Sequence, residues 1–419
     1  MKYISSTIQL LFFSFLIYTP YFKIGSISVS WGYLVLTLPL LFFLKKGSIK
    51  YNKDIIIVFQ SILFSFFVVA IIYVMNILRL NESTIDTRGI KIHIIAIIIF
   101  FSTFFIYKNY YSRMETFKLL RLVYFSLLIN PILVILLFLS ESFAEFLYQY
   151  ISINPRIFTT PPLRYPGFSY DGTSYLSSFH ALVFSLGWIL FFDPRKQSLI
   201  QILILILSQL IIFVSMMFIG RSGLIVAFLG ILMLIFYLSK NKLIFKLKTF
   251  YKISFLIVAA IIAAFQILII INFLGYGWYV DWAFSFLGFE ERDTSIDELL
   301  NNHYFLPGSW SDLLIGNSDF GTDPLISSFH SDVGYVKYIF GSGIIGLIAF
   351  LIIIFNFIKI SIKYFRVKPQ IAYMCILISA SLLLTNFKDF YFFYPYTHYI
   401  LLFFMFFALT DKKRDPQNG

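Results

Sequence analysis

Long runs of apolar residues, separated by shorter polar or basic stretches, follow one another along the whole chain. A helix needs roughly 20 such residues to cross about 30 Å of hydrocarbon, and most of the runs approach that length. The pattern therefore predicts about twelve transmembrane helices. The expected spans are Ser5–Tyr21, Ile27–Leu44, Ile55–Leu78, Ile92–Tyr107, Leu119–Leu139, Leu176–Phe192, Leu199–Ile219, Leu224–Leu238, Ile253–Leu274, Gly334–Phe357, Ile371–Thr385 and Tyr396–Leu409.

The first run has the length of the apolar core of a secretory signal peptide. No small-residue cleavage site follows it, so we expect an uncleaved span. In sequence order the runs divide the chain into alternating membrane regions and outer loops. These are a first membrane region (1–139), a first outer loop (140–175), a second membrane region (176–274), a large outer loop (275–332) and a last membrane region with its tail (333–419).

The composition agrees with a membrane protein and excludes a soluble one. Of the 419 residues, 59% are hydrophobic and only 13% are charged, whereas roughly a quarter of the residues in soluble domains are charged. The aromatic fraction is 21%, with 53 Phe and 28 Tyr, residue types that suit lipid and the membrane interface. A soluble fold could not bury this much apolar surface, so we expect an all-α polytopic membrane protein.

The basic residues are unevenly divided between the two sides of the expected spans. With an even number of spans and the N-terminus inside, 23 of the 33 Lys and Arg but only 5 of the 21 Asp and Glu fall on one side. The other side holds 9 basic and 16 acidic residues, and Lys337 lies within a span. This division predicts a bacterial inner-membrane protein with cytoplasmic termini and periplasmic large loops. Scattered over short inner loops, the basic residues suit anionic lipid headgroups and exclude nucleic acid as a partner.

Two outer loops, 140–175 and 275–332, are longer than the others, and we expect the chemistry to reside there. In the second loop, the pattern of Asp293–Leu300 predicts a capped amphipathic helix that lies on the membrane surface or covers a cavity. The sequence contains no obviously mirrored pair of broken helices, which transporters commonly display.

Three arginines on the outer side are candidates for binding phosphate groups. Arg156 and Arg164 lie in the first outer loop among prolines and glycines that make a stiff turn, and Arg221 lies within Gly220–Gly223 at the outer end of a span. The planar guanidinium group suits phosphate oxygens and stays charged at any relevant pH. The alternatives are pairing with Asp171 or with lipid headgroups and, for Arg221, a snorkelling anchor at the interface.

The large outer loop re-enters the membrane at Ser328–Tyr335, whose sequence is SFHSDVGY. His330 and Asp332 are close neighbours there, and either can act as a general base toward a sugar hydroxyl. The alternative is that His330 only caps the following helix. The glycines of the next segment, GSGIIG at 341–346, then only allow close helix packing.

A metal site is not expected. Cys375 is the single cysteine and lies inside an apolar run, which excludes an internal disulfide and a cysteine-rich metal site. His180, His303 and His398 show no HxxxH or HxxE spacing, so we expect ordinary hydrogen-bonded histidines.

Taken together, these features resemble the Wzy-type O-antigen polymerases, which share a superfamily with the O-antigen ligases. The shared features are about a dozen spans, a large loop that ends in HSDVGY and runs into GSGIIG, and an upstream GRSG between paired spans. The overall plan covers essentially the whole chain. In that family an arginine follows a small or hydroxyl residue at the outer end of a span, whereas here Ser222 follows Arg221.

In the ligases of this superfamily, a His-Asn or His-Ser stands eleven positions before the first glycine of a Gly-x-x-Gly at the next span. In this chain His330 stands eleven positions before Gly341, and Asp332 stands eleven positions before Gly343. Both residues therefore remain candidates for the reactive position.

The resemblance implies a GT-C-like fold and a glycosyltransferase of lipopolysaccharide biosynthesis. Such an enzyme transfers a growing glycan from undecaprenyl pyrophosphate to the non-reducing end of a new lipid-linked repeat unit. It uses no metal or cofactor, with Arg156, Arg164 and Arg221 on the pyrophosphate and His330 or Asp332 at the acceptor. Expected partners are undecaprenyl-pyrophosphate-linked oligosaccharides, membrane lipids, and the chain-length regulator and flippase of the pathway. The alternatives are an O-antigen ligase and a flippase of the lipid-linked oligosaccharide.

Overall fold

The structure, a computed structural model, divides the chain into two compact units. Unit 1 combines Met1–Gly32 with Phe117–Asp293, and unit 2 combines Tyr33–Thr116 with Thr294–Gly419. Each unit therefore joins an early and a late part of the sequence. The described residues are 2–25, 27–30, 52–80, 86–153, 165–169, 174–192, 197–220, 222–240, 301–321, 329, 331–388 and 396–411.

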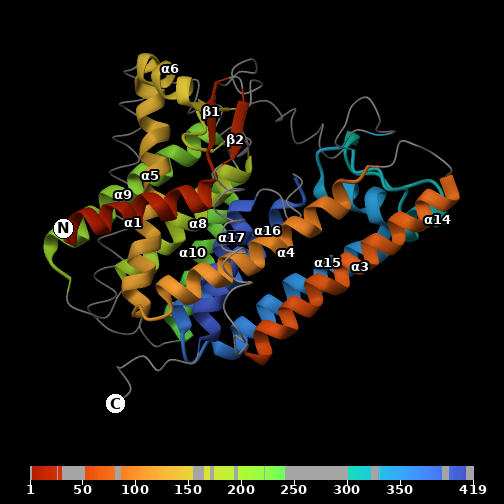
Figure 1. Cartoon of the computed structure of the whole chain (residues 1–419). Helices are drawn as coiled ribbons and strands as arrows, with labels where there is room; N and C mark the ends of the chain where they lie inside the picture. Colours follow the sequence, from red (N-terminus) through yellow and green to blue (C-terminus); the bar gives the residue numbers. More distant parts are fainter. Residues whose placement is uncertain are drawn as a thin grey trace. The chain divides into compact units, whose positions relative to one another are not determined.

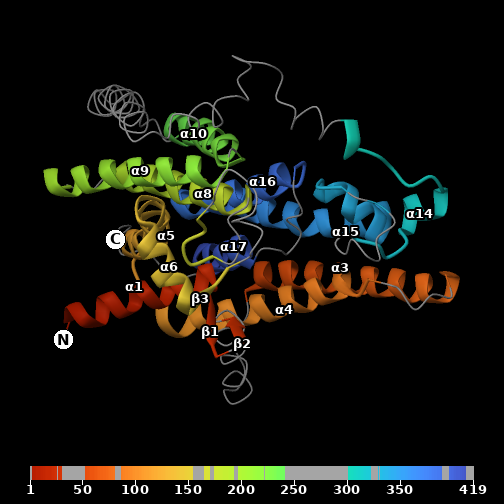
Figure 2. The ribbon, with the colours of Figure 1, turned by 90° about the horizontal axis from the view of Figure 1, so that it is seen from above.

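Unit 1 consists of helices and one small sheet (Figures 1 and 2). Its described elements are α1 (Lys2–Tyr18), β1 (Tyr21–Ile24), β2 (Ile27–Ser30), α5 (Thr116–Leu139), α6 (Glu141–Tyr150), β3 (Ile151–Ser152), α8 (Ser174–Phe191), α9 (Leu199–Ile219) and α10 (Ser222–Lys240). Helix α8 packs against both α9 and α10 and has a mostly buried surface (Figure 2). It is the core helix of this unit.

A proline inside α5 shows how unit 1 satisfies its buried backbone. Pro131 has no N–H, so it leaves the carbonyl of Leu127, four residues earlier, without its helical partner. The hydroxyl of Tyr18 donates a hydrogen bond to this carbonyl at 2.8 Å. An unpaired carbonyl in an apolar interior is costly, so this contact fixes α1 against α5.

Unit 2 is built around two long helices. Its described elements are α3 (Lys53–Leu80), α4 (Arg88–Ile106), the π-helical turn η1 (Tyr107–Tyr111), α14 (Trp310–Ile315), α15 (Gly334–Tyr364), α16 (Pro369–Thr385) and α17 (Tyr396–Thr410). Helices α3 and α15 run side by side (Figures 1 and 2). Helix α17 is buried almost throughout and packs against α4 and α16.

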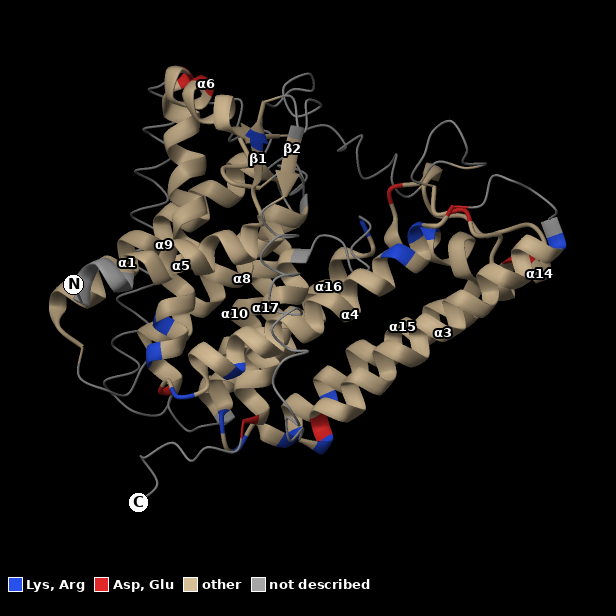
Figure 3. Ribbon diagram, viewed as in Figure 1, with Lys and Arg blue, Asp and Glu red and all other residues tan. Residues whose placement is uncertain are grey.

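Among the described residues, six helices are long and apolar enough to cross a membrane. They are Lys53–Arg79, Arg88–Tyr111, Thr116–Leu139, Leu199–Ile219, Ser222–Ser239 and Gly334–Tyr364. Four shorter apolar helices accompany them, at Thr7–Tyr18, Tyr175–Phe191, Pro369–Thr385 and Thr397–Thr410. Charged residues gather near the ends of α3 and α15 and leave their middles uncharged (Figure 3). The chain is therefore a helical, membrane-embedded protein.

The helices follow the apolar runs, with two corrections near the N-terminus. The expected span Ser5–Tyr21 ends at Tyr18, because Tyr21–Ile24 forms strand β1. The expected span Ile27–Leu44 cannot begin at Ile27, because Ile27–Ser30 forms strand β2. Strand β1 pairs antiparallel with β2 and with β3, and Gly25 takes a left-handed φ of 63° in the β1–β2 connection. The fold is thus not purely helical, because a tight turn at the glycine folds the chain back on itself. The expected span Ile253–Leu274 and the expected helix Asp293–Leu300 lie outside the described residues.

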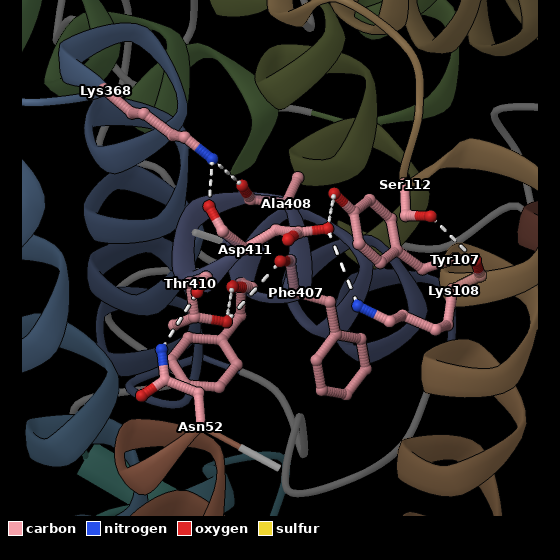
Figure 4. A network of polar contacts seen from close by, with 10 residues as sticks. Asn52, Tyr107, Lys108, Ser112, Lys368, Phe407, Ala408, Thr410 and Asp411 are labelled. Atoms are coloured by element: carbon pink, nitrogen blue, oxygen red, sulfur yellow. Dashed lines mark hydrogen bonds and ion pairs between the residues drawn. The ribbon is translucent and has the colours of Figure 1, made fainter. Parts of the chain in front are cut away.

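A polar network closes the end of unit 2 that we expect to face the cytoplasm (Figure 4). Lys368, at the start of α16, donates hydrogen bonds to the carbonyls of Ala408 and Asp411 at 2.7 and 2.8 Å. Asn52 donates to the carbonyl of Thr410 at 2.9 Å. These carbonyls belong to the last turn of α17 and to the residue after it, so the two side chains cap the helix from neighbouring elements.

An ion pair strengthens the same end of unit 2. The buried carboxylate of Asp54 accepts hydrogen bonds from the ammonium group of Lys363 at 2.9 Å and from the hydroxyl of Tyr364 at 2.8 Å. Asp54 lies in the first turn of α3, and Lys363 lies in the last turn of α15. Each charge therefore also opposes the partial charge of its own helix end.

Candidate functional site

Only one of the five expected site residues lies among the described residues. That residue is Asp332. The residues outside the described part of the chain are Arg156, Arg164, Arg221 and His330. Described residues adjoin Arg164, Arg221 and His330, however, and their contacts show how these three segments are held in their units.

In unit 1, Asn130 of α5 holds the described end of the first outer loop. Its Oδ1 accepts a hydrogen bond from the Phe168 N–H at 2.6 Å, and its Nδ2 donates to the Pro166 carbonyl at 3.3 Å. Gly167 between them has a φ of 65°, and a Cβ atom at this position would collide with the Asn130 amide. The glycine of the Arg164 motif is therefore required by contact as well as by backbone conformation.

Asn130 also links this loop to α8. Its Nδ2 lies 3.3 Å from Nε2 of His180, and Nδ1 of His180 lies 3.0 Å from Oγ of Ser215. The Ser215 hydroxyl in turn donates to the Ile212 carbonyl at 2.7 Å. Because an amide nitrogen only donates, His180 accepts at Nε2 and carries its proton on Nδ1 in this network. His180 is thus the hydrogen-bonded histidine that the sequence predicted.

The second arginine motif attaches to the same stretch of α8. The hydroxyl of Ser177 donates to the carbonyls of Gly220 and Met216, and its Oγ accepts from the Gly223 N–H at 3.1 Å. A Cβ atom at Gly223 would overlap Ser177. Both glycines that flank Arg221 are therefore bonded to one serine.

Ser177 and His180 are three residues apart on α8 and so lie on the same face of the helix. One holds the Gly220–Gly223 motif directly, and the other holds Pro166–Phe168 through Asn130. Sequence reasoning placed both motifs on the outer side but did not identify this shared support. The sequence signal was a histidine within a span whose other polar residues are serines, among them Ser177.

In unit 2, His303 holds the segment that contains Asp332. The Ser331 hydroxyl donates to the His303 carbonyl at 2.8 Å, and the Asp332 N–H donates to Nδ1 of His303 at 2.9 Å. In the neutral imidazole the proton is therefore on Nε2. His303 and Ser331 are buried, whereas the Asp332 side chain is exposed. The backbone of Asp332 is fixed while its carboxylate remains accessible.

The residue on the other side of His330 is held by aromatic packing. The Phe329 ring stacks on Phe340 of α15 with centroids 4.1 Å apart, and Phe305 meets both rings edge-on. Gly321, with a φ of 59°, leaves room for the Phe329 ring. Both chain neighbours of His330 are thus anchored, Phe329 by stacking and Ser331 by hydrogen bonding.

Helix α15, which follows this segment, is broken at Gly343. Gly343 has a φ of 66° inside the helix. The carbonyls of Phe340 and Gly341 accept hydrogen bonds from the backbone N–H groups of Asn317 and Ser318, at 2.8 and 3.1 Å. Non-helical backbone within a span is tolerated only when its polar groups find partners, and Asn317 and Ser318 supply them here.

The glycines around the break allow this backbone contact. A Cβ atom at Gly343 would overlap the backbone of Leu314, and one at Gly341 would overlap the Phe320 ring. Gly316, at a φ of 67°, faces Gly343 from the loop. Gly343 therefore allows close packing of α14 against α15, as one interpretation of the sequence predicted, and Gly341 makes room for the Phe320 ring.

Helix α3 holds the same loop from its other side. Arg79 donates to Oδ1 of Asp312 at 2.6 Å and to the Gly316 carbonyl at 3.2 Å. Asn76 donates to the Ser318 hydroxyl at 3.0 Å. The loop over residues 303–321, which we call the shelf, is thus bonded to the C-terminal end of α3 and to the N-terminal part of α15.

A buried polar cluster, which sequence reasoning missed, lies under the shelf. The Nδ1 of His93 in α4 bonds to the Gly89 carbonyl at 2.7 Å, and its Nε2 lies 3.0 Å from the Ser65 hydroxyl. The Tyr338 hydroxyl of α15 approaches the same Nε2 at 3.4 Å. The cluster ties α3, α4 and α15 together. Its sequence signal was His93, a histidine inside an apolar span, where an ionisable residue usually faces the protein interior.

Among the described residues, Asp332 is the candidate for contacting a substrate hydroxyl. It lies two residues before the first residue of α15, next to the positive end of the helix dipole, which favours a carboxylate there. An exposed carboxylate on a fixed backbone can orient a hydroxyl group by accepting its proton in a hydrogen bond.

A scan against models of protein families finds no match for this chain, and a search of curated proteins finds none either. The functional assignment therefore depends on the residues and their contacts.

Proposed function

We propose that the chain is a metal-independent polysaccharide polymerase of the Wzy type, which extends O-antigen in a bacterial inner membrane. In this proposal the growing glycan is transferred from undecaprenyl pyrophosphate to the non-reducing end of a new lipid-linked repeat unit. The reaction takes place at the periplasmic face, and both termini are cytoplasmic. The flippase of the pathway supplies the repeat unit, and the chain-length regulator limits the product.

The observation that carries the proposal is the shared support on α8. Ser177 and His180 hold the segments next to Arg221 and Arg164 within one turn of the same helix. A reaction that releases pyrophosphate without a metal needs several fixed cations around the departing oxygens. Two arginine motifs supported from one helix face meet that requirement better than two independent lipid contacts.

The transfer step forms one bond and breaks one bond at the anomeric carbon. The acceptor hydroxyl oxygen forms a bond to the anomeric carbon of the growing glycan, and the bond from that carbon to pyrophosphate breaks. The hydroxyl proton passes to a base, and undecaprenyl pyrophosphate leaves with the bonding electrons. We assign the base to His330 or Asp332, and the charge that develops on the leaving group to Arg156, Arg164 and Arg221.

The lipopolysaccharide banding pattern of a deletion strain tests the reaction class. A polymerase deletion leaves lipid A-core capped with a single repeat unit. Bare core instead indicates the ligase or the flippase, and an unchanged ladder removes the chain from this pathway. The three outcomes separate the candidate functions without any assumption about individual residues.

Variants in the complemented strain test the residues. Replacing Arg156, Arg164 or Arg221 by Lys should shorten the ladder nearly as much as Ala does, because Lys lacks the planar fork. Loss of polymerisation in His330→Ala, but not in Asp332→Asn, assigns the base to His330, and the reverse assigns it to Asp332. Full-length polysaccharide from all five variants would contradict the proposed site.

A further inference from the structure

Three large apolar side chains are exposed on the shelf of unit 2. Leu306 is 62% exposed, Trp310 is 79% exposed and Leu314 is 47% exposed. Trp310 and Leu314 are four residues apart in α14 and therefore share one face of that helix. A loop that faced only water would gain nothing by presenting a tryptophan and two leucines.

The other contacts of α14 prevent this face from turning inward. Asp312 is paired with Arg79 of α3 at 2.6 Å, and Ser309 caps the helix by accepting from the Asp312 N–H at 3.1 Å. At its other end, Gly316 meets the backbone of α15 at the break. The helix is thus fixed on two neighbours, with its apolar face directed away from them.

The position of α14 identifies what covers this face. Exposed apolar residues repeat every three or four positions along α3, which is the pattern of one helix face. They are Phe64, Phe67, Ile71, Val74 and Leu78, with exposed fractions between 51% and 77%. In a membrane-embedded helix such a stripe faces lipid. It ends at Leu78, beside Arg79, the residue that binds α14.

The charges of the shelf show what kind of lipid contact is possible. Residues 301–321 contain Asp312 and Asp319 but no Lys or Arg. Asp312 is paired with Arg79 within this unit. Attraction to anionic headgroups therefore cannot hold the shelf on the bilayer, and the contact must be apolar.

We propose that α14 is an interfacial membrane anchor. Trp310 and Leu314 insert at the boundary between headgroups and acyl chains, at the level where the lipid-facing stripe of α3 ends. Tryptophan is enriched at this depth because its ring is amphipathic. The anchor holds the shelf, and with it the His303–Asp332 contact, at a constant height above the hydrocarbon. This assignment does not depend on the proposed reaction.

Site-directed spin labelling tests the anchor in the full-length protein. Cys375 is the single cysteine and is buried, so Cys375→Ser provides the background. Labels are placed at Trp310→Cys and Leu314→Cys. Phe67→Cys serves as the lipid reference and Glu141→Cys as the water reference. The protein is reconstituted in phosphatidylcholine vesicles, with and without phosphatidylglycerol, and collisions with oxygen and with a water-soluble nickel chelate are measured.

At positions 310 and 314 we expect a ratio of oxygen to nickel collisions severalfold above that of Glu141→Cys and below that of Phe67→Cys, which lies in the middle of α3. Phosphatidylglycerol and salt should leave the ratio unchanged. A nickel-dominated ratio would show that the face lies in water. Shielding from both reagents would show a protein cover, and a ratio that rises with phosphatidylglycerol would show electrostatic binding. Each of these three results would overturn the anchor.

A second measurement uses no spin label, so it does not depend on whether the labelled cysteine variants fold. Trp310→Phe conserves an aromatic ring and removes one of the five tryptophans. If Trp310 lies at the interface, lipids brominated near the headgroup quench the wild-type fluorescence more than that of this variant. Equal quenching of the two proteins would contradict the proposal.

Discussion

At the scale of single residues, the glycines of the arginine motifs are required by contacts. Gly167 and Gly25 are both left-handed, at φ values of 65° and 63°, and both belong to unit 1. They differ in surroundings, because a Cβ atom at Gly25 meets nothing within 4 Å, whereas one at Gly167 collides with Asn130. Substitutions at these two glycines therefore distinguish the cost of backbone strain from the cost of losing the hydrogen bonds between Asn130 and the loop.

We therefore expect Gly25→Ala to lower the unfolding free energy by about 1 kcal/mol, the cost of a left-handed alanine. Gly167→Ala should lower it by about 2 to 4 kcal/mol, since Asn130 must also release buried partners. Thermal unfolding in detergent measures the difference. Equal effects of the two substitutions would show that Asn130 does not hold the loop.

His303 permits a second residue-scale prediction, about which of its nitrogen atoms matters. Nδ1 accepts the Asp332 N–H, and the Oδ1 of an asparagine can take the same place. A glutamine places its polar atoms at the Nε2 end instead. His303→Asn should therefore be more stable than His303→Gln by about 1 kcal/mol, although asparagine is the smaller residue. A more stable glutamine variant, in the same detergent melts, would contradict this hydrogen bond.

At the scale of elements, the break in α15 depends on close approach of two backbones. Gly343→Ala combines a left-handed alanine with overlap on Leu314, so we expect a loss of about 2 to 4 kcal/mol. Gly308→Ala is the matched control on the shelf, where a Cβ atom meets nothing within 4 Å and φ is not left-handed. It should change stability by less than about 0.5 kcal/mol.

Unfolding curves of the two variants in the same detergent check this prediction. Hydrogen exchange at Asn317 and Ser318 gives a second readout, because their N–H groups bond to the carbonyls that the break exposes. Gly343→Ala should speed exchange at both amides. Unchanged exchange would mean that these hydrogen bonds do not depend on the glycine.

At the scale of the whole molecule, orientation is the property that the charges predict. Reporter tags at the C-terminus and within Lys240–Lys252 should report cytoplasm, and tags near Glu291 and Thr160 should report periplasm. The physical reason is the excess of basic residues on one side of the spans. A periplasmic signal from the C-terminus would reverse the orientation and move every proposed site residue to the cytoplasm.

The helix positions could be predicted because they depend on local composition. A run of apolar residues near 20 long forms a helix in lipid whatever surrounds it, since its backbone must be satisfied internally. Leu199–Ile219 was predicted with the bounds that the structure has. The strand at Ile27–Ser30 could not be predicted in this way, because it exists only through pairing with β1, which also pairs with the distant residues of β3.

Only some residues of the candidate site could be predicted from the sequence. Motifs such as Gly220–Gly223 stand out because charge and glycine are rare in apolar surroundings. Their supports, Asn130, Ser177 and His180, are polar residues within spans and carry no spacing that marks them. Their role appears only when α5 and α8 are brought together.

By itself, then, the sequence determined that this is a helical membrane protein and where most of its helices lie. It also showed which segments carry the candidate arginine, histidine and aspartate residues. These properties follow from the length of the apolar runs and from the positions of the charges, which a contiguous stretch of roughly 20 residues contains. Only the tertiary structure decided that His303 holds Asp332, that Asn317 and Ser318 complete a broken helix, and that α8 supports two arginine motifs. Each of these is a hydrogen bond between groups far apart in the sequence, and its formation depends on packing that no local pattern records.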